Sequence, residues 1–286
     1  MRASAFQKVL VKLFQKLAGL GGAQGLKKGK KMSRIIAVTN QKGGVGKTTT
    51  NINLSTCLAQ AGKRVLVVDM DPQGNTTSGF GIDKFTMKQT VYNLLIGEAA
   101  LEDIILPVCV EGVRLLPANI DLSGAEVELI TMDEREFRLK TIFNHSRYLF
   151  DYILIDCPPS LNLLTLNALC AADSVLIPIQ CEYYALEGLS QLMSTIKRVQ
   201  HKLNPRLAIE GIVFTMYDGR TNLSNQVVEE VKSHLGAHTY ETIVPRNVRL
   251  SEAPSHGLPI TLYAADSKGA EAYKQLANEL MARNTK

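Results

Sequence analysis

The sequence predicts an α/β fold in which a mostly parallel, twisted sheet is flanked by helices. Short, continuously apolar runs alternate with longer helical patterns along the chain, and this alternation is typical of βαβ units with a sheet buried on both faces. A glycine-rich loop follows the first apolar run, and aspartates end two later ones. Ligands of such sheets bind at the carboxyl ends of the strands, so we expect the functional site there.

The elements follow one another in a regular order. Apolar runs that we interpret as strands occupy residues 35–38, 65–68, 152–155, 174–179, 209–215 and 242–244. Helical patterns predict helices at residues 48–61, 161–171, 186–201, 222–235 and 269–282. Gly62 follows the first of these helices and is a typical stop signal. We see no internal repeat and no linker to a second domain, so residues 32–286 are expected to form one domain.

Bulk composition narrows the classes of function. No apolar run approaches the roughly 18 residues of a transmembrane helix. Tryptophan is absent and 6% of residues are aromatic, which argues against base stacking as the main mode of nucleic-acid binding. The five cysteines have no metal-ligand spacing, so we expect them to be small core residues in a reducing cytosol.

Residues 1–31 form a basic segment ahead of a mildly acidic body. They hold eight of the 32 lysines and arginines and none of the 27 acidic residues, so any DNA contact by the body must come from a local patch. Apolar residues from Phe6 to Leu20 recur at helical spacing between lysines, which predicts a basic amphipathic helix. Met32 directly precedes the first strand, so we favour a mis-called start. A membrane- or DNA-associating arm and a disordered tail are the alternatives.

The glycine-rich loop predicts a phosphate-binding site and makes the fold a single P-loop domain. Residues 42–49 read Lys-Gly-Gly-Val-Gly-Lys-Thr-Thr between a strand and a helix. The glycines let backbone N–H groups and the helix N-terminus face phosphate oxygens. Lys47 then reaches the β- and γ-phosphates and the Thr48 hydroxyl ligates Mg²⁺, so the expected cofactors are ATP and Mg²⁺. The nucleotide-binding residues that we predict in the loop are Lys42, Gly43, Gly44, Val45, Gly46, Lys47, Thr48 and Thr49.

Three aspartates at strand ends are predicted to serve the metal and the attacking water. Asp69 and Asp71 follow the strand at 65–68 in alternation, so both are expected on the side of the phosphates. We predict that Asp71 positions or activates the water and that Asp69 supports the Mg²⁺ shell. Asp156, after the strand at 152–155, fits a Walker B aspartate that holds Mg²⁺ through water.

The loop departs from the standard pattern in two places. Position 41 is glutamine where the pattern has glycine, and a second lysine, Lys42, stands at the start of the loop. This form resembles the deviant Walker A motif of the ParA/MinD class of P-loop ATPases, in which the extra lysine crosses a dimer interface and touches ATP held by the other subunit. The resemblance implies that Lys42 is such a charge supplied in trans, and that Lys42, Lys47 and Asp71 are the catalytic residues.

Longer strings resemble the chromosomal ParA proteins often called Soj. They lie at residues 156–160, 180–188 and 244–254, and the resemblance covers nearly all of residues 33–283. It implies a cytoplasmic, nucleoid-associated ATPase of chromosome or plasmid partitioning. Such an ATPase forms a homodimer on ATP, binds DNA without sequence preference, and releases it when a ParB-type centromere-binding protein stimulates hydrolysis.

The same resemblance implies site residues beyond the loop. Pro245 and Asn247 would lie beside the adenine, which needs a flat apolar wall and amide-type hydrogen bonds. Arg220, Arg246 and Arg249 would touch DNA phosphates on the surface of the dimer, and such binding should fall steeply with salt.

The segment after Asp71 is a candidate switch. It contains Gly74, Gly79 and Gly81, and we interpret these glycines as a source of the flexibility that an order–disorder element at the nucleotide requires.

Other functions use a similar loop. A MinD-like, membrane-associated positioning ATPase would carry a C-terminal amphipathic anchor, but residues 277–286 are short and weakly amphipathic, so only residues 1–31 could substitute. A nitrogenase-type iron protein needs cysteines that share a cluster across a dimer, and Cys157 lies too near the expected core. A metabolic P-loop enzyme needs a second pocket for its substrate, which the sequence does not locate.

Overall fold

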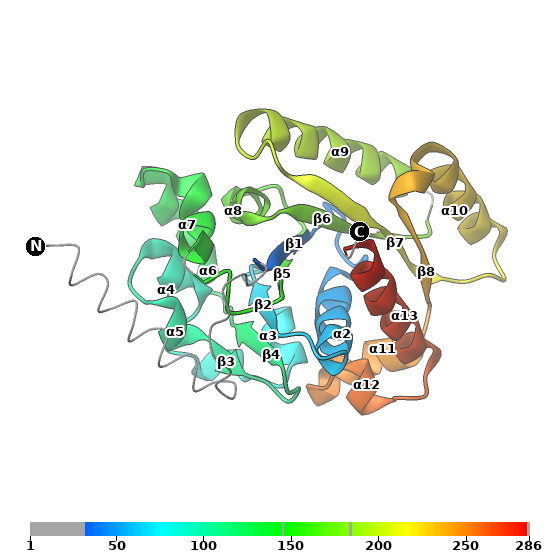
Figure 1. Ribbon diagram of the computed structural model, residues 1–286, viewed down its shortest axis with the longest axis horizontal. Helices are drawn as coiled ribbons and strands as arrows, with labels where there is room; N and C mark the ends of the chain where they lie inside the picture. Colours follow the sequence, from blue (N-terminus) through cyan, green and yellow to red (C-terminus); the bar gives the residue numbers. More distant parts are fainter. Residues whose placement is uncertain (1–31, 145, 183–184, 285–286) are drawn as a thin grey trace, which may run out of the picture.

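The computed structural model describes residues 32–144, 146–182 and 185–284. Within them, the strands form one eight-stranded sheet in the order β3-β4-β2-β5-β1-β6-β7-β8 (Figure 1). The strands are β1 Arg34–Val38, β2 Val65–Asp69, β3 Leu106–Pro107, β4 Val113–Leu116, β5 Tyr152–Asp156, β6 Ser174–Gln180, β7 Ala208–Tyr217 and β8 Thr239–Pro245. Neighbouring strands are parallel except β3 and β4. The predicted fold class is confirmed.

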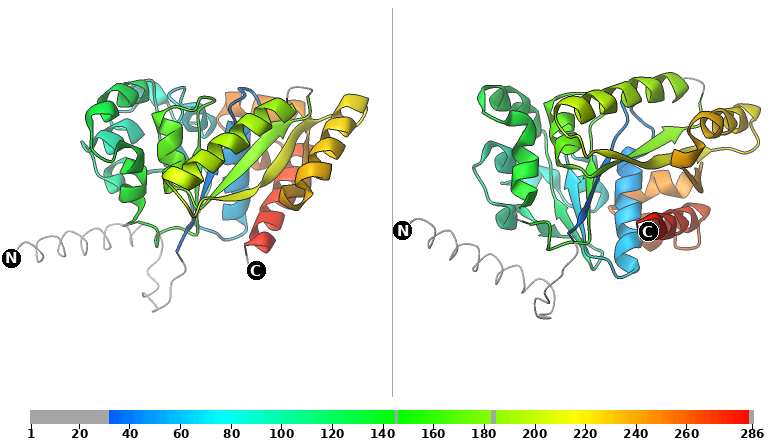
Figure 2. Two further views of the ribbon diagram at one scale, coloured as in Figure 1. Left: turned by 90° about the horizontal axis from the view of Figure 1, so that it is seen from above. Right: turned by 45° about the horizontal axis from the view of Figure 1, so that its top comes forward.

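Helices lie on both sides of the twisted sheet (Figure 2). They are α2 Lys47–Gln60, α3 Asn75–Gly79, α4 Val91–Ile96, α5 Leu101–Ile104, α6 Leu122–Glu128, α7 Arg138–Asn144, α8 Leu163–Ala171, α9 Ala185–Lys202, α10 Asn222–Leu235, α11 Val248–Glu252, α12 Ile260–Tyr263 and α13 Lys268–Arg283. Side chains of β1 alternate between two cores: Ile35 and Ala37 pack with α8 and α9, and Ile36 and Val38 pack with α2 and α13. This burial on both faces explains why β1 reads as a continuous apolar run.

Every strand and helix that the sequence predicts is present, with ends shifted by at most three residues. The strands and α-helices it did not predict lie at 75–144 and 248–263. They are short, and most have too few residues to show a helical period. The predictions for residues 1–31 lie outside the described part of the chain. No helix within the described residues has the length and apolarity to cross a membrane.

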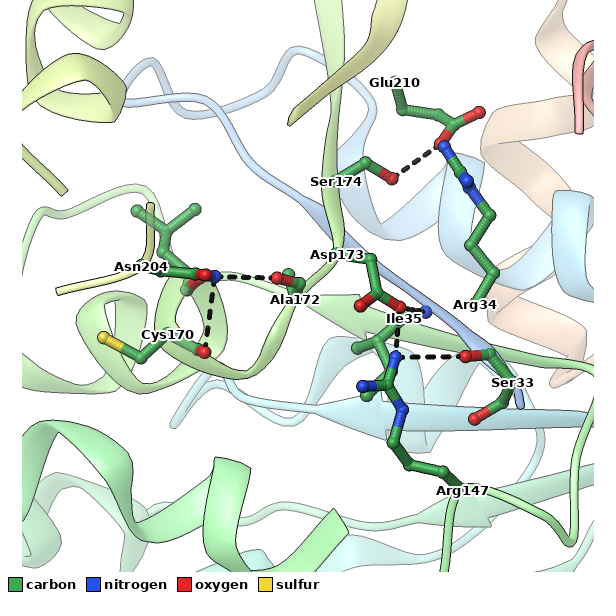
Figure 3. Close-up of polar contacts among 11 residues, drawn as sticks. Ser33, Arg34, Ile35, Arg147, Cys170, Ala172, Asp173, Ser174, Asn204 and Glu210 are labelled. Atoms are coloured by element: carbon green, nitrogen blue, oxygen red, sulfur yellow. Dashed lines mark hydrogen bonds and ion pairs between the residues drawn. The ribbon is translucent and has the colours of Figure 1, made fainter. Parts of the chain in front are cut away.

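A polar network fixes the amino ends of the strands, at the edge of the sheet away from the glycine-rich loop (Figure 3). Nη2 of Arg34 lies 2.6 Å from Oε2 of Glu210, which also accepts a 2.6 Å hydrogen bond from the Ser174 hydroxyl. Arg147 forms an ion pair with Asp173, which in turn accepts a bond from the N–H of Ile35. These contacts tie the start of β1 to Asp173, just before β6, and to Glu210 of β7.

The cysteines mostly behave as expected. Four of them are buried, namely Cys57, Cys157, Cys170 and Cys181. The prediction is wrong for Cys109, which is exposed because it lies in the turn between β3 and β4.

The glycines after Asp71 are needed for close packing, and the flexibility that we predicted from them stays a prediction. A Cβ at Gly79 would overlap Cδ1 of Ile52 in α2, and a Cβ at Gly74 would lie 2.7 Å from the carbonyl oxygen of Ala118. Gly81 has a φ of +79° and packs against the backbone of Gly257. Helix α3 is therefore held tightly between α2 and the turn that precedes α12.

Replacing Gly79 with alanine should destabilise the protein. The new methyl group displaces Ile52 in a closely packed site, which costs about 1–3 kcal/mol and lowers the melting temperature by several degrees in thermal unfolding. Gly188→Ala is the control, because that helical glycine has no atom within 4 Å of the added Cβ and alanine favours helix. Equal melting temperatures for Gly79→Ala and the parent chain would contradict the packing argument.

Candidate active site

The glycine-rich loop connects β1 to α2 at the carboxyl edge of the sheet. Gly44 and Gly46 have φ values of +73° and +87°, which non-glycine residues rarely adopt, and a Cβ at Gly43 or Gly44 would have no neighbour within 4 Å. Gly46 is the N-cap of α2, and Lys47 is the first residue of the helix. The loop thus presents open backbone and a helix N-terminus, as the phosphate-binding motif requires.

Side chains of the neighbouring strands hold this loop in place. The Thr215 hydroxyl of β7 donates a 2.9 Å hydrogen bond to the carbonyl of Val45. Asn40 accepts a bond of 3.0 Å from the N–H of Lys42 and donates one of 2.8 Å to the carbonyl of Pro178 in β6. We call the glycine-rich loop, with the Lys47 ammonium and the N-terminus of α2, the cradle. These bonds from β6 and β7 hold the cradle in shape before any phosphate binds.

The two lysines of the loop have different surroundings. Lys47 is buried, and its Nζ donates a 3.1 Å hydrogen bond to the carbonyl of Lys42. Burial lowers the pKa of Lys47, and the nearby carboxylates of Asp156 and Asp71 oppose that shift. Lys42 lies at the rim, and its Nζ is 2.8 Å from a carboxylate oxygen of Glu182 in the same chain. The ammonium of Lys47 thus lies within the loop, while that of Lys42 lies at its rim in an ion pair.

The predicted carboxylates meet at the ends of adjacent strands, since Asp69 and Asp156 are register partners in β2 and β5. Oδ2 of Asp156 accepts hydrogen bonds of 2.7 Å from the hydroxyls of Thr48 and Thr76. Its Oδ1 accepts a 3.1 Å bond from Nδ2 of Asn51. The structure therefore brings Asp156 to the first turn of α2, beside the threonine predicted to ligate Mg²⁺.

Asp69 lies behind this pair and is fully buried. Its Oδ2 accepts bonds from the N–H (2.8 Å) and hydroxyl (2.7 Å) of Thr77, and its Oδ1 accepts one of 3.2 Å from the N–H of Asp71. Through these contacts Asp69 holds the first turn of α3 and the backbone of Asp71 in place. Its support of the metal shell stays a prediction.

Asp71 lies just past the end of β2 and is mostly buried. Its Oδ1 accepts a 2.9 Å bond from the N–H of Gln73. Its negative charge acts on both Asp156 and Lys47: it raises the pKa of Asp156 and opposes the lowering of the Lys47 pKa. Asp71 thus lies at the carboxyl edge of the sheet, and its role toward the water stays a prediction.

The oxygen donors near the loop, the Thr48 hydroxyl and the Asp156 carboxylate, fit Mg²⁺. Burial, and then the charge of Asp156, raise the pKa of Asp69; burial also raises that of Asp156, with Asp71 adding to the shift. A bound cation relieves such crowding of anionic groups. No group of three or more histidine, cysteine or acidic side chains among the described residues could hold an ion. Mg²⁺ needs no such cage, because it is usually held by one or two carboxylates, substrate phosphates and waters.

The residues predicted to face adenine lie at the end of β8. Pro245 lines a cavity of about 640 Å³ between the end of β8 and the start of α13, together with Tyr217 and Lys268. Asn247 caps α11, since its Oδ1 accepts a 2.9 Å bond from the N–H of Arg249. Pro245 therefore borders a space at the edge of the sheet that carries the loop, and Asn247 lies two residues further on.

Of the predicted DNA-binding arginines, Arg220 and Arg246 lie in the loops after β7 and β8, and Arg249 lies in the short helix α11. The N–H of Arg246 donates to the carbonyl of Tyr217, which joins the loops after β7 and β8. Arg220, whose side chain is 87% exposed, pairs with Asp218 at 2.6 Å, and hydrogen bonds from Arg220 together with the charges of both arginines lower the pKa of Asp218 to about 2. Arg249 pairs with Glu252 at 2.8 Å. The three arginines thus leave a modest surplus of positive charge.

Sequence reasoning missed several residues of the site. Thr76 and Asn51 donate to Asp156, Thr215 anchors the loop, and Glu182 pairs with Lys42. Only Asn51 gave a usable signal, because an amide one turn after Lys47 lies on the same face of α2. The others come from distant parts of the chain.

Comparison with known proteins agrees with this geometry. A family model described as an AAA domain matches residues 33–209. The chain is 59% identical over 251 residues to the sporulation initiation inhibitor protein Soj of Bacillus subtilis, which covers 88% of this chain and 99% of that protein. It is 56% identical over 254 residues to the chromosome partitioning protein ParA of Myxococcus xanthus, with 89% and 90% covered.

Solved structures extend the likeness to bound nucleotide. Cobyrinic acid a,c-diamide synthase from Mycobacterium smegmatis with bound ADP and magnesium has a TM-score of 0.78 and 39% identity, over 89% of this chain and 96% of that one. The cell division ATPase MinD of Pyrococcus furiosus has a TM-score of 0.74 and 30% identity, over 88% and 100%. The chain therefore belongs to the ParA/Soj family of P-loop ATPases, with ATP as its substrate and Mg²⁺ as its metal.

Proposed function

We propose that this ATPase is a chromosome- or plasmid-partitioning switch whose ATP-bound homodimer holds DNA. The observation that carries the proposal is the second lysine of the loop. Lys47 already fills the lysine position of the chain's own cradle, so a further ammonium group at the rim has a use where it meets phosphates of a second chain. The high identity to proteins named Soj and ParA supports the partitioning role.

Each residue of the cradle has a part in this scheme. Backbone N–H groups of residues 43–48 and the Lys47 ammonium bind the phosphates, while Thr48 and Asp156 hold Mg²⁺. The metal, when bound, offsets the negative charge of the phosphates. Asp71 orients the attacking water, and Asp69 keeps the backbone of Asp71 in place through its 3.2 Å hydrogen bond. Pro245 and Asn247 face the adenine.

Dimerisation is what allows the arginine cluster, formed by Arg220, Arg246 and Arg249, to bind DNA tightly. Asp218 and Glu252 offset much of the charge of Arg220, Arg246 and Arg249, so a single chain should hold DNA weakly. Two copies side by side double the cluster and act as one bivalent site. Binding of this kind uses phosphates, ignores base sequence and weakens steeply with salt. A protein with this role works in the cytoplasm on the nucleoid.

Hydrolysis then ends the DNA-bound state. A ParB-type centromere-binding protein is the partner that we expect to stimulate it, through a basic N-terminal arm. Thr76 and Thr77 of α3 donate to both buried carboxylates, so a change at the metal is passed directly to α3.

Replacing Lys42 with alanine should abolish the ATP-dependent dimer and lower DNA affinity by about 10²-fold, the scale of a lost bivalent effect. Nucleotide binding by the single chain should persist, since Lys47 is untouched. Light scattering after size exclusion, with Mg²⁺ and the non-hydrolysable analogue AMPPNP, gives the mass; fluorescence anisotropy with a random DNA duplex gives the affinity. Lys232→Ala, which removes a lysine of an ordinary surface ion pair, is the control. A Lys42→Ala protein that still dimerises would refute the trans role.

A further inference from the structure

Lys42, the lysine that the proposed function assigns to the partner's ATP, is held within its own chain. Its Nζ lies 2.8 Å from Oε2 of Glu182. Glu182 directly follows the end of β6, the strand beside β1. Its other oxygen, Oε1, accepts a 2.5 Å hydrogen bond from Gln180, and its backbone carbonyl accepts one of 2.9 Å from the N–H of Ala185. The carboxylate is therefore fixed at the rim of the loop, where it neutralises Lys42.

The backbone of Lys42 is tied to the resting cradle as well. Its N–H donates to Oδ1 of Asn40, and its carbonyl accepts a 3.1 Å hydrogen bond from Nζ of Lys47. The motif places the Lys47 ammonium on the β- and γ-phosphates when nucleotide is bound, so that ammonium then has stronger acceptors than a carbonyl. Filling the chain's own cradle thus loosens one of the contacts that hold Lys42.

We propose that Glu182 is the positioning residue of Lys42: it holds the lysine while the chain is single and yields it to the phosphates of a second, ATP-loaded copy. This inference rests on the proposed trans role of Lys42. The exchange favours the phosphates, which carry more charge and more acceptor oxygens than one carboxylate. The side chains of Lys42 and Glu182 are 36% and 45% exposed, and a pair that exposed is weak enough to be displaced.

Glu182→Gln removes the charge but keeps the shape and an oxygen for the bond from Gln180. The dimer formed with Mg²⁺ and AMPPNP should become tighter, with a Kd about two- to fivefold lower, the range that a partly exposed ion pair covers. The affinity of the single chain for ADP should not change, because Lys42 does not serve its own nucleotide. Sedimentation equilibrium measures the first quantity and isothermal titration calorimetry the second.

Glu241→Gln is the matched control. Glu241 also pairs with a lysine, Lys232, at 3.0 Å, and that lysine side chain is likewise 36% exposed. The control should leave the dimer Kd unchanged, and high salt should erase the gain from Glu182→Gln.

The outcomes separate this inference from the function on which it rests. An unchanged or weaker Glu182→Gln dimer, with Lys42→Ala unable to dimerise, overturns the role of Glu182 and leaves the trans lysine intact. An altered ADP affinity in Glu182→Gln also overturns it, because that result marks a general structural effect. Normal dimerisation of Lys42→Ala removes the trans role and this inference together.

Discussion

Replacing Asp71 with alanine is expected to slow ATP hydrolysis by about 10²- to 10⁴-fold, the contribution of a well-placed group that orients or deprotonates water. ATP binding should survive. The phosphate-binding groups lie on the loop and on Lys47, whereas the Asp71 carboxylate accepts a hydrogen bond from the N–H of Gln73, in the segment after β2. Phosphate release measures the rate, and calorimetry with AMPPNP measures binding.

The same variant should stay on DNA. If hydrolysis ends the DNA-bound state, Asp71→Ala with ATP should remain a dimer on DNA for as long as the parent chain does with AMPPNP. Asp133→Ala is the control, because Asp133 is an exposed aspartate outside the site. An Asp71→Ala protein that hydrolyses ATP at the normal rate would disprove the role of Asp71. One that no longer binds AMPPNP would show that Asp71 supports the cradle itself.

The sequence located the site because parallel sheets leave little choice. Once β1, β2 and β5 are identified as buried strands, their carboxyl ends must share one edge. The loop, Asp69 and Asp156 then have to meet, as the pairing of Asp69 with Asp156 confirms. Identifying the strands along the sequence was therefore enough to place these residues together.

The contacts that tune those groups could not be predicted in the same way. Thr76 binds Asp156 across 80 positions of sequence, and Lys42 meets Glu182 across 140. Such pairs depend on how helices and loops pack, and a single sequence holds no periodic signal for that packing.

Glycine shows how one residue type can have two uses. Gly44 and Gly46 were expected to free backbone N–H groups for phosphate, and both have the positive φ values that glycine allows. Gly79 was expected to give flexibility, yet its missing side chain lets α3 approach Ile52 of α2. The sequence alone does not separate the two uses, because both are satisfied by the absence of a Cβ.

Replacing Lys47 with alanine should weaken nucleotide binding itself, by about 10- to 100-fold, the range for loss of hydrogen bonds to a charged group. The fold should not suffer. The Lys47 ammonium donates to the carbonyl of Lys42 within the loop, and its burial, which lowers the pKa of Lys47, is itself unfavourable to folding. Calorimetry with ADP and AMPPNP measures the affinity, and thermal unfolding without nucleotide measures the stability.

Lys88→Ala is the control for a general loss of positive charge, because Lys88 is exposed and lies outside the loop. Lys47→Ala and Lys42→Ala should then differ in kind: the first loses affinity for both ADP and AMPPNP, while the second keeps both and fails only to dimerise. If both variants instead lost nucleotide affinity equally, the two lysines would serve one cradle. The loop would then be an ordinary phosphate site, without a part that belongs to a second chain.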